Sequence, residues 1–143
     1  MLETRYIPKL GRAITRLGLG ALPMGSLQRR LSPEQGEIIV RAAVESGITF
    51  IDTATTYGTY EHIARGLKGW SGSVTIATKT HARDNKALAR EHIEKALKDL
   101  GRETIDIMLC HCGRLDFTEE LWGPSLEALI AARQEGLIGM IGI

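Results

Sequence analysis

Asp52 ends a short, mainly apolar stretch at residues 49–52 that has the composition of a buried strand, and Tyr57 follows five positions later. Lys79 and His111 each end another apolar stretch farther along the chain. Polar groups at strand ends do little to fill a core, and many α/β enzymes place their reactive groups there. These four residues are therefore the first candidates for chemistry.

Together, the four residue types support proton transfer to a carbonyl oxygen. Tyr57 is a weak acid, and a protonated Lys79 beside it would stabilise the phenolate that remains after the proton leaves. Asp52 would keep that lysine charged and in place. His111 would hydrogen-bond the carbonyl oxygen or share the proton. Because no side chain supplies a hydride, carbonyl reduction here implies a nicotinamide cofactor.

Taken singly, each of these residues also has a structural interpretation. Asp52 could cap the turn that follows it, and Tyr57 could be a surface tyrosine. Lys79 could be a solvated charge and His111 a structural histidine. The catalytic interpretation gains weight because separate strands bring all four to one end of a sheet. The structural interpretation is kept for the remaining histidines, which fall in predicted helices or loops: His62, His81 and His92.

The elements that must position these residues alternate between apolar strands and amphipathic helices. After a hairpin at residues 5–16, strands are predicted at 17–22, 49–52, 74–79, 104–110 and 137–143. Helices are predicted at 33–46, 60–67, 86–100 and 126–135. Successive strands are about 30 residues apart, the length of a βαβ unit, so the sequence predicts a parallel sheet covered by helices.

Capping residues mark the ends of these helices. Ser32, Pro33 and Gln35 form a capping box with proline in the first turn, and Gly101 ends the helix at 86–100. Ser125 is the predicted cap of the last helix, after a loop that contains Gly123 and Pro124. The first helix is predicted to bury one apolar face: Ile38, Ile39, Ala42, Ala43 and Val44.

Two architectures fit this order, a doubly wound open sheet and part of a (β/α)8 barrel. Asp52, Lys79 and His111 end three successive strands, and in a barrel such strand ends meet at one mouth, where catalysis takes place. The polar residues thus favour the barrel. We expect a single domain over residues 1–143, with no linker inside it.

The composition excludes several classes of partner. The chain has 143 residues, a net charge of +1 and 24% charged residues, so nothing in it favours nucleic acid or an anionic membrane. No apolar run is long enough to span a bilayer, and no signal peptide opens the sequence, so a cytoplasmic protein is expected. Cys110 and Cys112 flank His111 without a second ligand cluster, and we expect two reduced thiols and no metal.

The sequence resembles the aldo-keto reductase family. The most specific match is Phe50-Ile51-Asp52-Thr53-Ala54-Thr55-Thr56-Tyr57-Gly58, and residues 16–20, 76–79, 105–111 and 126–143 match further segments in order. The resemblance implies a (β/α)8 barrel, with the N-terminal hairpin as its plug, that uses NADP(H) to reduce aldehydes and ketones to alcohols. It implies Tyr57 as the general acid, tuned by Lys79 and Asp52, with His111 orienting the carbonyl. Gly20 and Ala21, with Asp52, are the implied cofactor contacts.

The length implies about half of such a barrel. A complete one needs about 250 residues, whereas the predicted elements give a hairpin and (βα)4β, without the segments that hold most of the cofactor in the family. Two sheet edges are then open, so we expect self-association and little or no activity of the chain alone. The alternative function is a catalytically incomplete half-barrel that acts only with a partner supplying the other half.

Overall fold

The computed structural model describes residues 2–112 and 117–143. The chain opens with an antiparallel hairpin, β1 (Thr4–Ile7) and β2 (Arg12–Thr15), as predicted. Five parallel strands follow and pair in chain order: β3 (Leu19–Gly20), β4 (Phe50–Asp52), β5 (Thr75–Thr80), β6 (Ile105–Cys110) and β7 (Ile138–Gly142). The hairpin is a separate two-stranded sheet.

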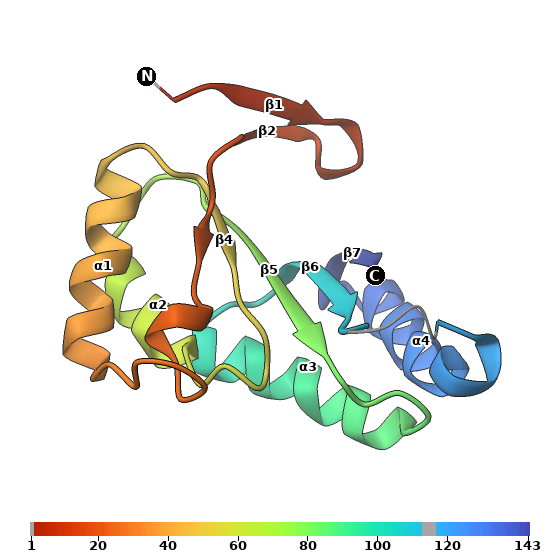
Figure 1. Ribbon diagram of the computed structural model, residues 1–143. Helices are drawn as coiled ribbons and strands as arrows, with labels where there is room; N and C mark the ends of the chain where they lie inside the picture. The colour runs from red at the N-terminus through yellow and green to blue at the C-terminus, as the bar shows by residue number, and fades with distance from the viewer. Residues whose placement is uncertain (1, 113–116) are drawn as a thin grey trace.

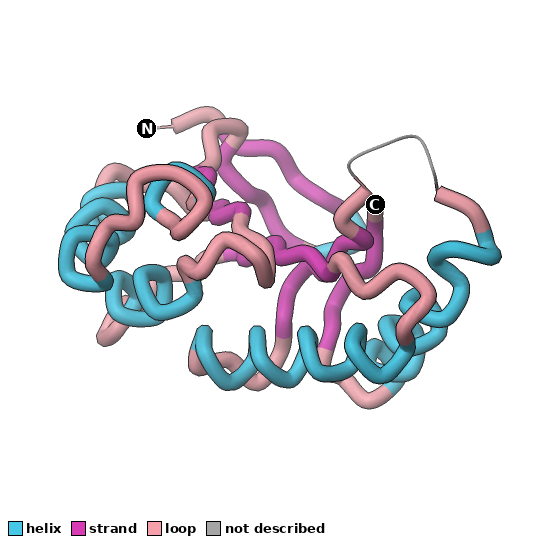
Figure 2. Tube along the Cα trace, turned by 60° about the horizontal axis from the view of Figure 1, so that its bottom comes forward, coloured by secondary structure: helices cyan, strands magenta, loops and turns pink. Residues whose placement is uncertain are grey.

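Four α-helices connect the strands: α1 (Pro33–Glu45), α2 (Tyr60–Leu67), α3 (Lys86–Leu100) and α4 (Glu119–Gln134). They all lie on the same face of a curved sheet, and the hairpin lies across the end where the strands begin (Figures 1 and 2). A doubly wound sheet would carry helices on both faces and reverse its strand order. The predicted (βα)4β segment of a barrel, preceded by a hairpin, is therefore confirmed.

The hairpin is tied to the sheet by polar contacts. The backbone N–H groups of Thr15 and Thr49 each donate to the other residue's hydroxyl, at 2.9 and 3.0 Å. The Arg12 guanidinium donates to the Thr75 hydroxyl at 2.9 Å and forms an ion pair with Asp106. These contacts close the end of the sheet where the strands begin.

The capping box of α1 is present, but the predicted buried face of this helix is wrong. Ile38 and Ile39 are 69% and 38% exposed, and of the predicted face only Val44 is buried. The buried face is instead built around Gly36, Val40 and Val44. A Cβ on Gly36 would lie 2.0 Å from the His62 ring of α2. Close helix packing against glycine, which an apolar pattern does not count, decides which face is buried.

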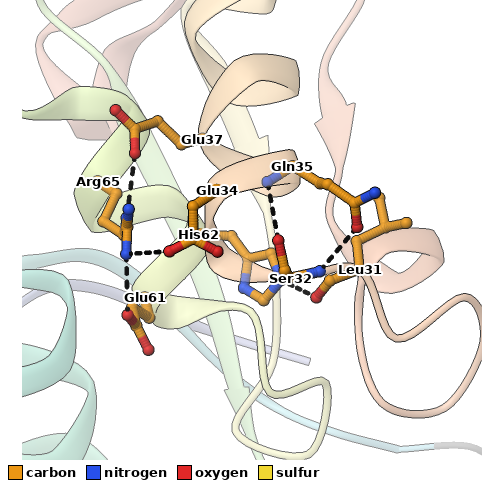
Figure 3. A network of polar contacts seen from close by, with 8 residues as sticks. All are labelled: Leu31, Ser32, Glu34, Gln35, Glu37, Glu61, His62 and Arg65. Carbon is orange, nitrogen blue, oxygen red and sulfur yellow. Dashed lines mark hydrogen bonds and ion pairs between the residues drawn. The ribbon is translucent and has the colours of Figure 1, made fainter.

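Arg65 of α2 joins the same two helices at their surface. Its guanidinium lies 2.8 Å from Glu34, 3.0 Å from Glu37 and 3.5 Å from Glu61 (Figure 3). Figure 3 also shows the capping box and the His62 ring, whose Nε2 lies 2.9 Å from the Leu31 carbonyl. Ion pairs this exposed to solvent add little to stability.

The start of α4 also differs from the prediction. The helix begins at Glu119, with Thr118 as its N-cap, and contains Pro124. Pro124 has no N–H to donate, and the next N–H, of Ser125, donates to the Arg83 carbonyl at 3.1 Å instead. Ser125 thus anchors α4 to the loop after β5 rather than capping it. The predicted loop before α4 includes residues 113–116, which lie outside the described residues.

No helix among the described residues is long and apolar enough to cross a membrane.

Candidate active site

The register of the sheet brings the ends of β4, β5 and β6 together. Asp52 pairs with Ala77, and Thr80 pairs with Cys110, the last residue of β6. The His111 backbone N–H continues this ladder by donating to the Thr80 carbonyl at 2.7 Å. The candidate residues of three strands therefore meet at one mouth of the sheet, as the sequence predicts.

Lys79 is the centre of the site. Its Nζ lies 2.7 Å from both carboxylate oxygens of Asp52 and 2.7 Å from the Thr53 carbonyl. The lysine side chain is only 14% exposed, so these three acceptors replace the water that its charge would otherwise hold. The same Nζ lies 5.1 Å from the centroid of the Tyr57 ring. A positive charge is thus held beside the phenol.

Tyr57 belongs to a loop that the segment before α1 holds in place. The Tyr57 carbonyl accepts a 3.0 Å hydrogen bond from the Ser26 N–H. Gly25 lies so close that a Cβ there would be 1.9 Å from the same carbonyl oxygen. Inside the loop, the hydroxyls of Thr53 and Thr59 are 2.8 Å apart and both residues are fully buried. The loop that carries the phenol is therefore fixed by main-chain packing against Gly25 and Ser26 and by a side-chain hydrogen bond within the loop.

His111 completes the group. Its ring meets the Tyr57 ring edge-on, with centroids 5.9 Å apart and an interplanar angle of 76°. Burial lowers the pKa of His111, and the positive charges of Lys79 and His81 lower it further, against an opposing effect of Asp52. The imidazole is therefore held neutral near neutral pH, in a state suited to hydrogen bonding with an uncharged oxygen.

His81 also lies in this region, although the sequence predicts only a structural histidine there. Its Nδ1 lies 3.3 Å from the Thr55 hydroxyl, and its ring centroid lies 4.6 Å from that of His92. His92 is buried and its Nδ1 lies 2.7 Å from the Thr80 hydroxyl, which agrees with its structural interpretation. Its position in the sequence indicates this location, because His81 comes two residues after Lys79 at the same strand end.

The residues predicted to contact a cofactor differ in their surroundings. A Cβ on Gly20 would meet no atom within 4 Å, and the Asp52 side chain is 38% exposed, so both leave room at the mouth. Ala21 is fully buried and its N–H donates to the Asp52 carbonyl at 2.8 Å. Gly20 and Asp52 are therefore the better placed of the three to meet a bound molecule.

The cysteines lie beside this site without forming a metal centre. Cys110 and Cys112 are not joined by a disulfide, and burial raises the pKa of the Cys110 thiol to about 11, which makes it a poor nucleophile at neutral pH. Within residues 2–112 and 117–143, no three His, Cys, Asp or Glu side chains gather as metal ligands.

A family of known proteins shares these features. The family model for aldo/keto reductases matches residues 16–143, which include the whole parallel sheet and all four candidate residues. The chain belongs to the aldo/keto reductase family.

Individual aldo/keto reductases agree with this assignment. L-Galactose dehydrogenase of Arabidopsis thaliana is 28% identical over 99% of the chain, and methylglyoxal reductase DkgA of Salmonella typhimurium is 30% identical over 93%. An aldo-keto reductase of Bombyx mori, solved in complex with NADP, is 22% identical over 99% of the chain with a TM-score of 0.78, a likeness of fold. These matches cover 48%, 46% and 50% of the respective proteins, so the chain spans about half the length of its relatives.

Proposed function

We propose that this chain carries the proton-transfer residues of an NADP(H)-dependent aldo-keto reductase that reduces a small aldehyde or ketone to an alcohol, with Tyr57 as the proton donor. The observation that carries the proposal is the Lys79 ammonium, which is bound by Asp52 and the Thr53 carbonyl and lies 5.1 Å from the Tyr57 ring centroid. The ammonium is placed where it would stabilise the negative charge that Tyr57 carries after giving its proton to a substrate.

In the proposed reaction, the Tyr57 hydroxyl gives its proton to the carbonyl oxygen, which becomes the alcohol oxygen. NADPH, when bound, supplies the hydride that the carbonyl carbon accepts. The negative charge left on Tyr57 is stabilised by Lys79, which Asp52 holds in position. His111 donates a hydrogen bond from its neutral ring to the carbonyl oxygen and orients it.

The mouth fits a nicotinamide cofactor on the side of Gly20 and Asp52. Gly20 presents main chain with open space above it, so a flat group can approach without meeting a side chain. Asp52 offers a partly exposed carboxylate, although Lys79 already occupies both of its oxygens. The NADP in the Bombyx mori structure and the carbonyl substrate named for the Salmonella relative support this choice of cofactor and reaction.

The decisive experiment replaces Tyr57 in a complete barrel. Since the relatives are about twice as long, residues 1–143 are co-expressed with the part of DkgA that lies beyond the matched region. Oxidation of NADPH is then followed with a nitrobenzaldehyde as substrate. Tyr57→Phe should lower kcat by about 10²–10⁴-fold, the usual contribution of a general acid.

Tyr6→Phe is the matched control, because this tyrosine lies in the hairpin and is 61% exposed. It should keep the turnover of the unchanged protein. Equal turnover by the Tyr57 and Tyr6 variants would refute the assignment of Tyr57.

A second candidate function is a half-barrel that acts only with a partner. It is favoured by the sheet, in which β3 and β7 are each paired on one side only among the described residues. Leaving the second half out of the same assay tests this alternative, because residues 1–143 alone should give no turnover and gain it when the second half is added. Turnover by the chain alone would instead show that it is an autonomous enzyme.

A further inference from the structure

A cleft lies at the end of the sheet opposite to the candidate active site. It opens between the C-terminal ends of α2 and α3, beside the segments that lead into β5 and β6, and has a volume of about 480 Å³. Clefts of this size hold small molecules. Its lining combines an apolar part, chiefly Leu67, Leu100 and Trp70, with the cationic side chains of Arg65, Lys68 and Arg102.

Trp70 forms a rigid aromatic wall of this cleft. The indole edge lies against Gly72, where a Cβ would be 2.6 Å from the indole Nε1. The Arg41 guanidinium lies 5.9 Å from the indole centroid and also donates to the Lys68 carbonyl at 2.5 Å. The Trp70 Nε1 is buried and has no hydrogen-bond acceptor among the described residues. Gly72 and Arg41 thus hold the indole ring in place, and the indole N–H has no acceptor among the described residues.

The charge of the cleft is positive and largely uncompensated. Arg65 is neutralised by the three glutamates in Figure 3. Within the described part of the chain, Lys68 has no ion pair, and the only hydrogen bond of the Arg102 side chain is one of 3.4 Å to the Val74 carbonyl. No acidic residue is among those found to line the cleft. Two cations therefore stand beside an apolar wall without an anion.

We propose that this cleft binds a small organic anion, with a flat apolar body against Trp70 and a carboxylate or phosphate group between Lys68 and Arg102. Arginine and lysine both form charge-assisted hydrogen bonds with such groups. A flat apolar body on the indole removes apolar surface of both from water. The site is independent of the proposed reductase function, because none of its residues belongs to the candidate active site.

Phenyl phosphate is a suitable probe, because it combines a flat ring with a dianion. Binding is followed by two-dimensional ¹H–¹⁵N NMR of the full chain through the indole N–H signals of its two tryptophans, assigned with Trp70→Phe. The Trp70 signal should shift in a saturable way, while that of Trp122, which is fully buried elsewhere, should not. Phenol and inorganic phosphate, which carry the ring or the charge alone, should each bind at least about tenfold more weakly.

The variant Lys68→Gln/Arg102→Gln should weaken phenyl phosphate binding by about tenfold or more, because each charge-assisted hydrogen bond contributes about that factor. Lys9→Gln/Arg29→Gln removes the same charge from exposed residues outside the cleft and should leave the affinity unchanged. The proposal is overturned if the Trp70 signal does not shift, if both double variants bind equally well, or if inorganic phosphate binds as tightly as phenyl phosphate.

Discussion

The close approach of Gly25 to the Tyr57 main chain predicts that Gly25→Ala destabilises the candidate active site. The backbone of Gly25, with φ −81° and ψ −178°, is one that alanine adopts freely, so only the contact matters. The new Cβ would lie 1.9 Å from the Tyr57 carbonyl oxygen, whereas ordinary contacts begin at 3.4 Å. The oxygen belongs to the main chain and the Cβ is fixed rigidly to it, so the two atoms must separate by about 1.5 Å through movement of a whole segment.

Two contributions lower the free energy of unfolding of Gly25→Ala, and one raises it. Overpacking costs about 1–3 kcal/mol, and separation also breaks the 3.0 Å hydrogen bond from Ser26 to Tyr57, which contributes about 0.5–1.5 kcal/mol. The reduced freedom of the unfolded chain returns about 0.4–1 kcal/mol. The free energy of unfolding should therefore fall by about 0.5–4 kcal/mol.

Gly20→Ala is the matched control. Its φ is not positive, and its Cβ would meet no atom within 4 Å, so the substitution should be neutral or stabilise by up to about 1 kcal/mol. Urea unfolding measures both variants, and hydrogen exchange of the Ser26 amide reports the local effect, since it should accelerate only in Gly25→Ala. Equal urea midpoints together with a protected Ser26 amide in both variants would refute the packing argument.

Two further predictions concern pH and association. Burial, together with the charge of His81, lowers the pKa of His92 below 6.5. The unfolded chain therefore binds more protons at this histidine than the folded chain does below that pH. The free energy of unfolding should be highest above pH 6.5 and fall as the pH drops below it. Urea midpoints on both sides of pH 6.5 test this, and His92→Gln should reduce the dependence without abolishing it, because the lowered pKa of His111 acts in the same direction. The open edges of β3 and β7 should make the chain self-associate, and a well-behaved monomer at micromolar concentration in analytical ultracentrifugation would contradict this.

The sequence predicted best those features that depend on residues close together in the chain, such as helix caps and strand ends. Strand ends, the α1 capping box and Gly101, with φ 65°, all follow from local rules, and these suffice to bring Asp52, Lys79 and His111 to one mouth. The roles of the four residues and the cofactor contacts remain predictions.

The errors arose where tertiary contacts outweigh local rules. Pro124 stands inside α4 because the neighbouring Ser125 bonds to Arg83, a residue 42 positions away. The buried face of α1 follows Gly36 because α2 approaches closely there, and no pattern of apolar residues in α1 records that approach. The contacts of His81 with Thr55 and His92 could not be predicted, because the sequence does not show which side chains the loops bring beside it.

Two aspartates, Asp106 and Asp52, lie at opposite ends of the sheet, and their surroundings differ. Asp106, at the start of β6, is 14% exposed and has both oxygens engaged, one by Arg12 of the hairpin and one by the Ile76 N–H at 2.8 Å. Asp52, at the end of β4, binds a single lysine and keeps 38% exposure. Both are carboxylates paired with a cation, yet the first is enclosed by the hairpin and the second opens onto the mouth. The second pair is also the one beside a phenol, because the Lys79 Nζ lies 5.1 Å from the Tyr57 ring centroid.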